Sequence, residues 1–138
     1  MFKRYGDYPT SVLISRITES EKKIFVSNIL KYNRSGMVKQ ASSHTLRCLL
    51  YLFMFNKSIS NEILDIELPS ESSDKYTSIS TRILYSDYIR YKNLINKLRV
   101  IHTKKYITSS NTIRRLILWY NSNPSIAETV ITEYKYTV

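Results

Sequence analysis

The longest apolar run of the chain, "LRCLLYLFMF", extends from Leu46 to Phe55 and constrains the fold more than any other segment. Its apolar side chains surround nearly the whole circumference of a helix, which Ser42 or Ser43 can cap at the start. The run is interrupted by Arg47 and is about half as long as the roughly 20 residues that cross a bilayer. We therefore expect a central, fully packed helix in the core of one small domain, and no membrane span.

The N-terminal part carries one strong helix signal. The first 17 residues are mixed in character and predict an arm or a short strand, with a turn in "GDYP". "TESE", from Thr18 to Glu21, fits a capping box, in which the Thr and Glu side chains each bond to the other residue's backbone amide. This signal predicts a helix from about Glu19 to Tyr32. Gly36, shortly after it, can take the left-handed conformation that ends a helix.

Two more helical patterns follow the central helix. A short helix is expected to reach about Ile66, with Ser58 or Ser60 as its cap. Between Ser80 and Leu98, apolar residues recur at spacings of four and three, which is the period of one helical stripe. This stripe predicts either one long helix or a short helix followed by a second that begins at Ser86.

The segment from Val100 to Tyr120 has the pattern of a β-hairpin. β-branched residues are frequent in "VIHTKKYI", "TSSN" supplies a turn, and "TIRRLILWY" returns. Asn123 and Pro124 then predict the start of a final helix. The last residues fit a helix and a strand equally well, and no internal repeat is evident along the chain.

Positive charge is concentrated in one quarter of the chain. The net charge is +10 and the pI is about 9.7. The 34 residues from Arg82 to Arg115 hold nine cations and a single acid, Asp87, for a net charge of +8, whereas the segment from Glu62 to Lys75 carries a net charge of −4. This uneven, basic distribution favours a polyanionic partner over a neutral small molecule.

Sequence signals for catalysis and metal binding are missing. The single cysteine, Cys48, lies in the apolar run, where a buried hydrophobe is expected, and His44 and His102 stand in no ligand-like spacing. The sequence has no Gly-rich phosphate loop, nucleophile elbow or His-Glu-x-x-His motif. We therefore expect a protein that is not an enzyme and uses no cofactor or metal. Since no signal peptide is readable, a cytoplasmic location is expected.

The predicted elements, in order, are similar to a winged helix-turn-helix: packed helix, short helix, acidic loop, basic helix and hairpin. In "YIRYKNLINKLRVIHTKKYI", Leu94 and Leu98 followed by Val100 and Ile101 resemble the end of a recognition helix and the opening of the wing in phage and plasmid replication or regulatory proteins. The resemblance implies a mainly α fold with a small β-hairpin. The chain then divides into an N-terminal arm and helix (1–41), a winged-helix core (42–120) and a C-terminal extension (121–138).

The same resemblance implies a double-stranded DNA-binding protein, with RNA as an alternative ligand, that acts as a transcriptional regulator or a replication accessory factor. A homodimer through the first helix or the C-terminal segment is expected, because a lone module reads too few bases. No membrane partner is expected. The predicted nucleic-acid contacts are Arg82, Arg90, Lys92, Asn93, Lys97, Arg99, Lys104, Lys105, Arg114 and Arg115.

Two kinds of contact are expected from these residues. Arg90 and Asn93 lie off the apolar stripe, so they are predicted to face base edges in the major groove. The predicted hairpin pairs Lys104 with Arg115 and Lys105 with Arg114, and these four cations at the tip of the wing are predicted to meet phosphates.

Two other functions fit the composition. One is a small basic structural protein of a ribonucleoprotein or virion. The other is a protein-interaction module, or an inhibitor of a nucleic-acid enzyme, that uses the acidic stretch from Glu62 to Asp74 to engage a basic partner. The tyrosine-rich, alanine-poor composition is typical of an AT-rich genome, such as those of several phages and mobile elements.

Overall fold

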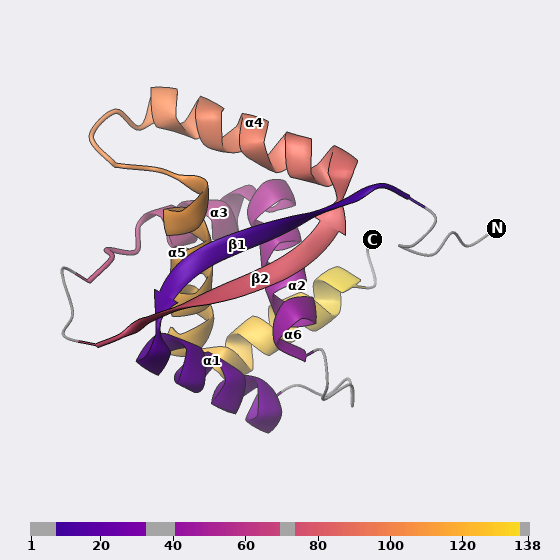
Figure 1. The fold of residues 1–138 in the computed structure, drawn as a ribbon, viewed down its shortest axis with the longest axis vertical. Helices are drawn as coiled ribbons and strands as arrows, with labels where there is room; N and C mark the ends of the chain where they lie inside the picture. The colour runs from indigo at the N-terminus through magenta and orange to yellow at the C-terminus, as the bar shows by residue number, and fades with distance from the viewer. Residues whose placement is uncertain (1–7, 33–40, 70–73, 136–138) are drawn as a thin grey trace.

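The computed structural model describes residues 8–32, 41–69 and 74–135, which form a mainly helical fold with one small antiparallel sheet, as predicted (Figure 1). The elements, in chain order, are β1 (Thr10–Thr18), α1 (Glu19–Tyr32), α2 (Ala41–Phe55), α3 (Lys57–Leu64), β2 (Tyr76–Leu84), α4 (Tyr85–Ile101), α5 (Ser109–Ser122) and α6 (Pro124–Lys135). Within these ranges, no helix is long and apolar enough to cross a membrane.

The sheet is a two-stranded ribbon formed by β1 and β2, which pair antiparallel from Thr10 opposite Leu84 to Thr18 opposite Tyr76. Side chains alternate between its two faces, as they do in any strand. The inner face carries buried apolar residues such as Leu13 and Ile83 and packs on α2 and α5. Figure 1 shows the ribbon in front of these two helices, with α1 and α4 on its opposite sides.

The order of the elements reveals an internal repeat, so the expectation that the chain contains none is wrong. The chain runs β-α-α-α twice: β1 to α3 form the first half, and β2 to α6 form the second half. β1 begins at Thr10 and β2 at Tyr76, 66 positions later. "SSHTLRCLLYLF", which begins at Ser42, corresponds to "SSNTIRRLILWY", which begins at Ser109, 67 positions later, with five identical residues. Residues at corresponding positions of the two halves are called counterparts below.

Matching hydrogen bonds join the two halves across the ribbon. The Ser15 hydroxyl donates to the Ser110 carbonyl at 2.9 Å, and its counterpart Thr81 donates to the Ser43 carbonyl at 2.7 Å. Each bond therefore links a strand of one half to the first turn of a helix in the other half. These paired contacts show that the two halves associate like the subunits of a symmetric dimer.

Aromatic packing in the core has the same symmetry. Phe25 of α1 meets Tyr120 of α5 edge-on, with ring centroids 5.1 Å apart, and the counterparts Tyr91 of α4 and Phe53 of α2 meet edge-on at 6.4 Å. One continuous cluster of buried residues draws on every helix and both strands. The three segments expected from the sequence, 1–41, 42–120 and 121–138, therefore contribute to a single core.

The helix predictions that rested on local signals are confirmed. The Thr18 hydroxyl accepts from the Glu21 amide at 3.1 Å, and the Glu21 carboxylate accepts from the Thr18 amide at 2.8 Å, so the capping box forms and α1 spans Glu19–Tyr32. α2 ends at Phe55 as expected, and Cys48 within it is buried. Its start differs from the prediction, because α2 begins at Ala41 and therefore includes Ser42 and Ser43, which were expected to cap it from outside. The predicted helix end at Gly36 lies outside the described residues, as does most of the "GDYP" turn.

Two predicted helix starts are wrong. The side chain of Asn56, rather than that of Ser58 or Ser60, caps α3 by accepting from the Ile59 amide at 3.1 Å. The stripe that begins at Ser80 covers the last residues of strand β2 and a single helix, α4. This helix starts at Tyr85 and has no side-chain cap. Strand and helix share apolar residues at their junction, so spacing alone did not separate them.

The hairpin expected between Val100 and Tyr120 is also wrong, because this segment contains the end of α4, a loop and α5. Thr108 caps α5 by accepting from the Asn111 amide at 3.0 Å, so "TSSN" begins a helix instead of making a turn. Ile113, Leu116, Ile117 and Tyr120 then bury one helical face. The final helix begins at Pro124 as predicted and continues to Lys135, so the segment is helical up to that residue, and residues 136–138 lie outside the described part of the chain.

Candidate nucleic-acid interface

The ribbon has an outer face that the described helices leave uncovered. Its exposed side chains are Val12, Ile14 and Arg16 of β1 and Tyr76, Ser78, Ser80 and Arg82 of β2. Two of the apolar ones are strongly exposed, Val12 at 42% and Ile14 at 62%. No acid occurs at any outward position of either strand, so the net charge of the outer face is positive.

The two arginines of the outer face are counterparts, and each is held by the first residue of the opposite strand. Arg82 donates from Nη1 to the Thr10 hydroxyl at 2.9 Å. The Arg16 guanidinium lies over the ring of Tyr76, the counterpart of Thr10, at 4.3 Å from its centroid. Both arginines are therefore oriented toward the two ends of the ribbon, which lowers the entropy that they lose when they bind a ligand.

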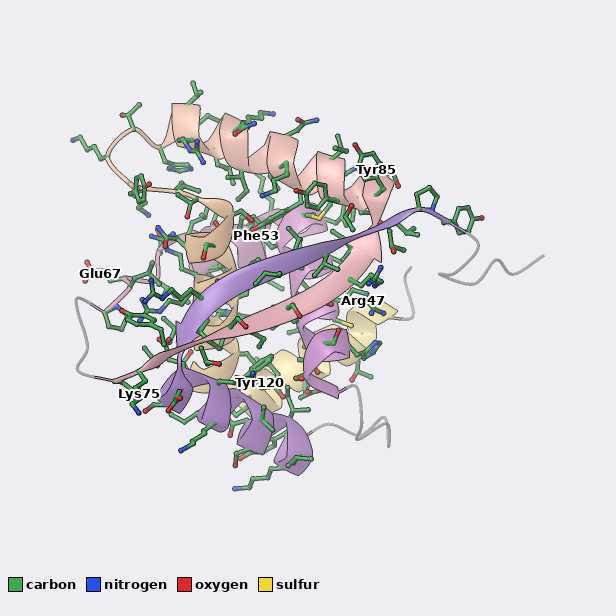
Figure 2. The ribbon with its side chains drawn as sticks, in the orientation of Figure 1. Arg47, Phe53, Glu67, Lys75, Tyr85 and Tyr120 are labelled. Atoms are coloured by element: carbon green, nitrogen blue, oxygen red, sulfur yellow. The ribbon has the colours of Figure 1, made fainter. Side chains whose placement is uncertain are left out.

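Two further cations bond to the backbone of β2. Lys22 donates from Nζ to the Ser78 carbonyl at 3.1 Å, and Arg47 donates from Nε to the Arg82 carbonyl at 2.9 Å. In Figure 2, Arg47 lies beside the end of β2 that leads into α4. A strand edge with free carbonyls is prone to pair with another strand, and these side chains occupy part of that edge. They also add positive charge beside the outer face.

Four of the predicted nucleic-acid contacts lie on helix α4 before its last turn: Arg90, Lys92, Asn93 and Lys97. Arg90 is 60% exposed, 3.7 Å from Asp87, and its guanidinium lies 5.4 Å from the centre of the Phe55 ring. Lys92 lies over the ring of Tyr88 at 5.4 Å. The other two, Asn93 and Lys97, are exposed.

Arg99, at the end of the predicted recognition helix, and Lys105, predicted at the tip of the wing, both bond to the protein itself. Arg99 donates to the Ile107 carbonyl at 2.9 Å, which closes the loop between α4 and α5. Lys105 donates to the Asp65 carboxylate at 3.0 Å and to the Leu64 carbonyl at 3.1 Å, so it ties this loop to the end of α3. Lys104 is exposed in the same loop.

Arg114 and Arg115 are not at an exposed hairpin tip, contrary to the prediction. The Nε atom of Arg114 lies 3.1 Å from both carboxylate oxygens of Glu21, and both side chains are largely buried. Arg115 is only 7% exposed and donates from Nε to the Ile66 carbonyl at 3.1 Å, and burial lowers its pKa. These two arginines stabilise the packing of α5 and do not form a phosphate-binding surface.

The ten predicted residues therefore do not converge on one surface. Arg82 alone lies on the outer face of the ribbon, five of the others lie on α4, and four belong to the following loop and α5. The sequence reasoning missed Arg16 and its neighbours on β1. A usable signal was present, because "LISRI" and "ISTRI" place Arg16 and Arg82 at the same position of two strands.

The described residues contain no cluster of histidine, cysteine and acidic side chains that could hold a metal ion. No family model matches the sequence, and no curated protein or solved structure is significantly similar to it. The comparisons therefore neither support nor oppose the winged-helix resemblance.

Proposed function

We propose that the protein binds double-stranded DNA and places the outer face of its ribbon in the major groove. One observation carries this proposal: an uncovered, acid-free ribbon face that presents two oriented arginines among short and apolar side chains. The function stays that of a transcriptional regulator or a replication accessory factor. The reading element differs from the recognition helix and wing expected from the sequence, since the segment assigned to the wing contains α5.

The dimensions of a two-stranded ribbon suit this groove. Paired strands lie about 4.8 Å apart, and the major groove of B-DNA is about 12 Å wide and admits a helix or a two-stranded ribbon. A guanidinium can bond to O6 and N7 of guanine in bidentate fashion, a serine hydroxyl bonds to either kind of base, and apolar side chains contact the thymine methyl group. The outer face offers all three chemistries.

The flanking helices supply the electrostatic part of the proposal. α1 and α4 lie on opposite sides of the ribbon (Figure 1). Exposed cations such as Lys23 of α1 and Lys97 of α4 lie on these helices, where the two phosphate backbones beside the groove would run. Phosphate contacts contribute affinity without sequence preference and make it depend on salt.

The internal repeat also bears on the expected homodimer. A single half would read few bases, but one chain already holds two halves joined by matching contacts. A second copy is therefore not required to form the ribbon. Association of two chains through α1 or the C-terminal segment would extend the bound site instead of completing it.

The first test is a binding measurement with fluorescent 30-base-pair duplexes drawn from a random pool, together with single-stranded RNA of the same length. We expect enrichment of specific duplexes and a double variant, Arg16→Ala with Arg82→Ala, that has lost this preference. Arg90→Ala with Asn93→Ala is the matched control on α4. If only the α4 variant loses preference, the helix reads the bases and the ribbon does not.

The same measurement separates the two alternative functions. A structural component of a ribonucleoprotein or virion would bind nucleic acid without enriching any sequence. A protein-interaction module would bind no duplex even at low salt, where electrostatic attraction is strongest. Either result would exclude the proposed function.

A further inference from the structure

We propose that the preferred DNA site is an inverted repeat with an asymmetric centre, and that the protein binds it in one orientation. The inference rests on the proposed function, because it specifies the duplex that the outer face reads. The two halves of this face are related by a local two-fold axis but differ in chemistry.

The local two-fold axis passes through the pair formed by Ile14 and Ser80. These residues face each other across the two strands, and they are also counterparts, since each is the fifth residue of its strand. Every other outward position of the ribbon therefore has its counterpart at the same distance on the other side of this pair. A two-fold reading surface requires half-sites in inverted order, because the two DNA strands are related by the same symmetry.

The arginine positions of the ribbon are equal in the two halves. Arg82 faces Val12, which precedes Arg16 by four residues, so the Cα atoms of the two arginines are about 13 Å apart along the ribbon. Their side chains lean further outward, toward Thr10 and Tyr76. Both ends of the site are therefore assigned a guanine, on opposite strands and separated by more than about four base-pair steps of 3.4 Å.

The central positions of the ribbon are unequal. Val12 faces Arg82 in one half, and its counterpart Ser78 faces Arg16 in the other half. At the centre, Ile14 of β1 lies opposite its counterpart Ser80. Apolar side chains favour a thymine methyl group, whereas serine hydroxyls accept either base. The half-site read by Arg82 and Val12 is therefore assigned a thymine next to the guanine, and the half-site read by Arg16 and Ser78 is not.

Symmetrising the outer face tests this assignment. The double variant Val12→Ser with Ile14→Ser gives β1 the serines that β2 carries at the counterpart positions, Ser78 and Ser80. Both substituted side chains are exposed, so the fold is expected to remain. Selection from a random duplex pool should yield an asymmetric consensus for the wild type. The variant should instead yield a consensus that is identical to its own reverse complement between the two guanines. A palindromic wild-type consensus, or an asymmetric one retained by the variant, would overturn the inference.

A second measurement probes the thymine contact directly. Replacing thymine by deoxyuridine removes only the C5 methyl group. In the half-site read by Val12 the replacement should weaken wild-type binding about fourfold, the equivalent of about 0.8 kcal/mol for one buried carbon group. In the other half-site, and for the symmetrised variant, it should have no effect. Equal losses in both half-sites would contradict the inference alone, whereas failure to enrich any duplex would remove the proposed function itself.

Discussion

The Nε atom of Arg114 lies 3.1 Å from both carboxylate oxygens of Glu21, although the two residues are 93 positions apart in the chain. The same carboxylate accepts from the Thr18 amide at the start of α1. One acid therefore caps a helix of the first half and anchors a helix of the second half. This ion pair is part of the interface that holds the two halves together.

Removal of the arginine should destabilise the fold more than removal of an exposed ion pair. The Arg114 and Glu21 side chains are only 12% and 11% exposed, so Arg114→Ala should lower the free energy of unfolding by about 3 kcal/mol. The matched control is Lys105→Ala, which breaks the exposed pair with Asp65 and should cost about 1 kcal/mol or less. Urea unfolding followed by circular dichroism measures both. Equal losses would contradict the assignment of Arg114 to the interface.

The hydroxyl of Thr81 should contribute to stability through its bond to the Ser43 carbonyl. Thr81→Val keeps the shape of this buried side chain and removes the hydroxyl that donates to the carbonyl, so we expect a loss of about 1 to 2 kcal/mol. The control is Ser80→Ala at the preceding position, where the side chain faces outward and the change should be within about 0.5 kcal/mol. Thermal unfolding of the three proteins decides the matter, and indistinguishable stabilities would argue against a contact between the halves at Thr81.

Base reading by the ribbon should depend on the planar guanidinium and not on charge alone. Arg82→Lys keeps the charge but loses the bidentate bond, so discrimination at one guanine should fall by roughly 1 to 3 kcal/mol. The dependence of affinity on salt should stay the same, because the number of phosphate contacts does not change. Competition between duplexes that differ at that base pair measures the first quantity, and a salt titration measures the second. A changed salt dependence with unchanged discrimination would assign Arg82 to phosphate.

Alkaline pH should weaken the fold through two buried tyrosines. Burial raises the pKa of Tyr91, which donates to the Ser109 carbonyl, and of Tyr120, which donates to Glu128. Above pH about 10 the unfolded chain releases these protons while the folded chain retains them, so the stability is complete below that pH and is lost as the pH rises. The loss approaches about 1.4 kcal/mol per pH unit for each tyrosine.

Tyr91→Phe provides the comparison for this effect. The variant should be less stable than the wild type at pH 8, since it lacks one hydrogen bond. The difference should shrink or reverse between about pH 10 and 11, because only the wild type has the ionisable group at this position. Urea unfolding at several pH values measures it. A difference that stays constant across this range would show that Tyr91 does not resist ionisation.

Local physical chemistry made several elements readable from the sequence alone. The capping box at Thr18 depends on two side chains three residues apart, and Pro124 fits a first helical position wherever the helix later packs. The apolar run of α2 also predicted a central helix, and most of its apolar side chains are buried, although Phe55 at its end is 49% exposed. Charge and composition also marked a basic protein, but they did not say where its cations lie.

The tertiary structure alone decided the pairing of β1 with β2 and the destinations of the cations. Strand pairing depends on a partner 66 positions away, and "TIRRLILWY" fits a strand or a helix until its buried face meets α1 and α2. The repeat was hidden because mainly its buried positions and a few helix-start residues stayed similar, while the exposed residues diverged. Arg114 and Arg82 look alike in the sequence. In the fold, Arg114 is largely buried and paired with the distant carboxylate of Glu21, whereas Arg82 is exposed on the outer face of the ribbon.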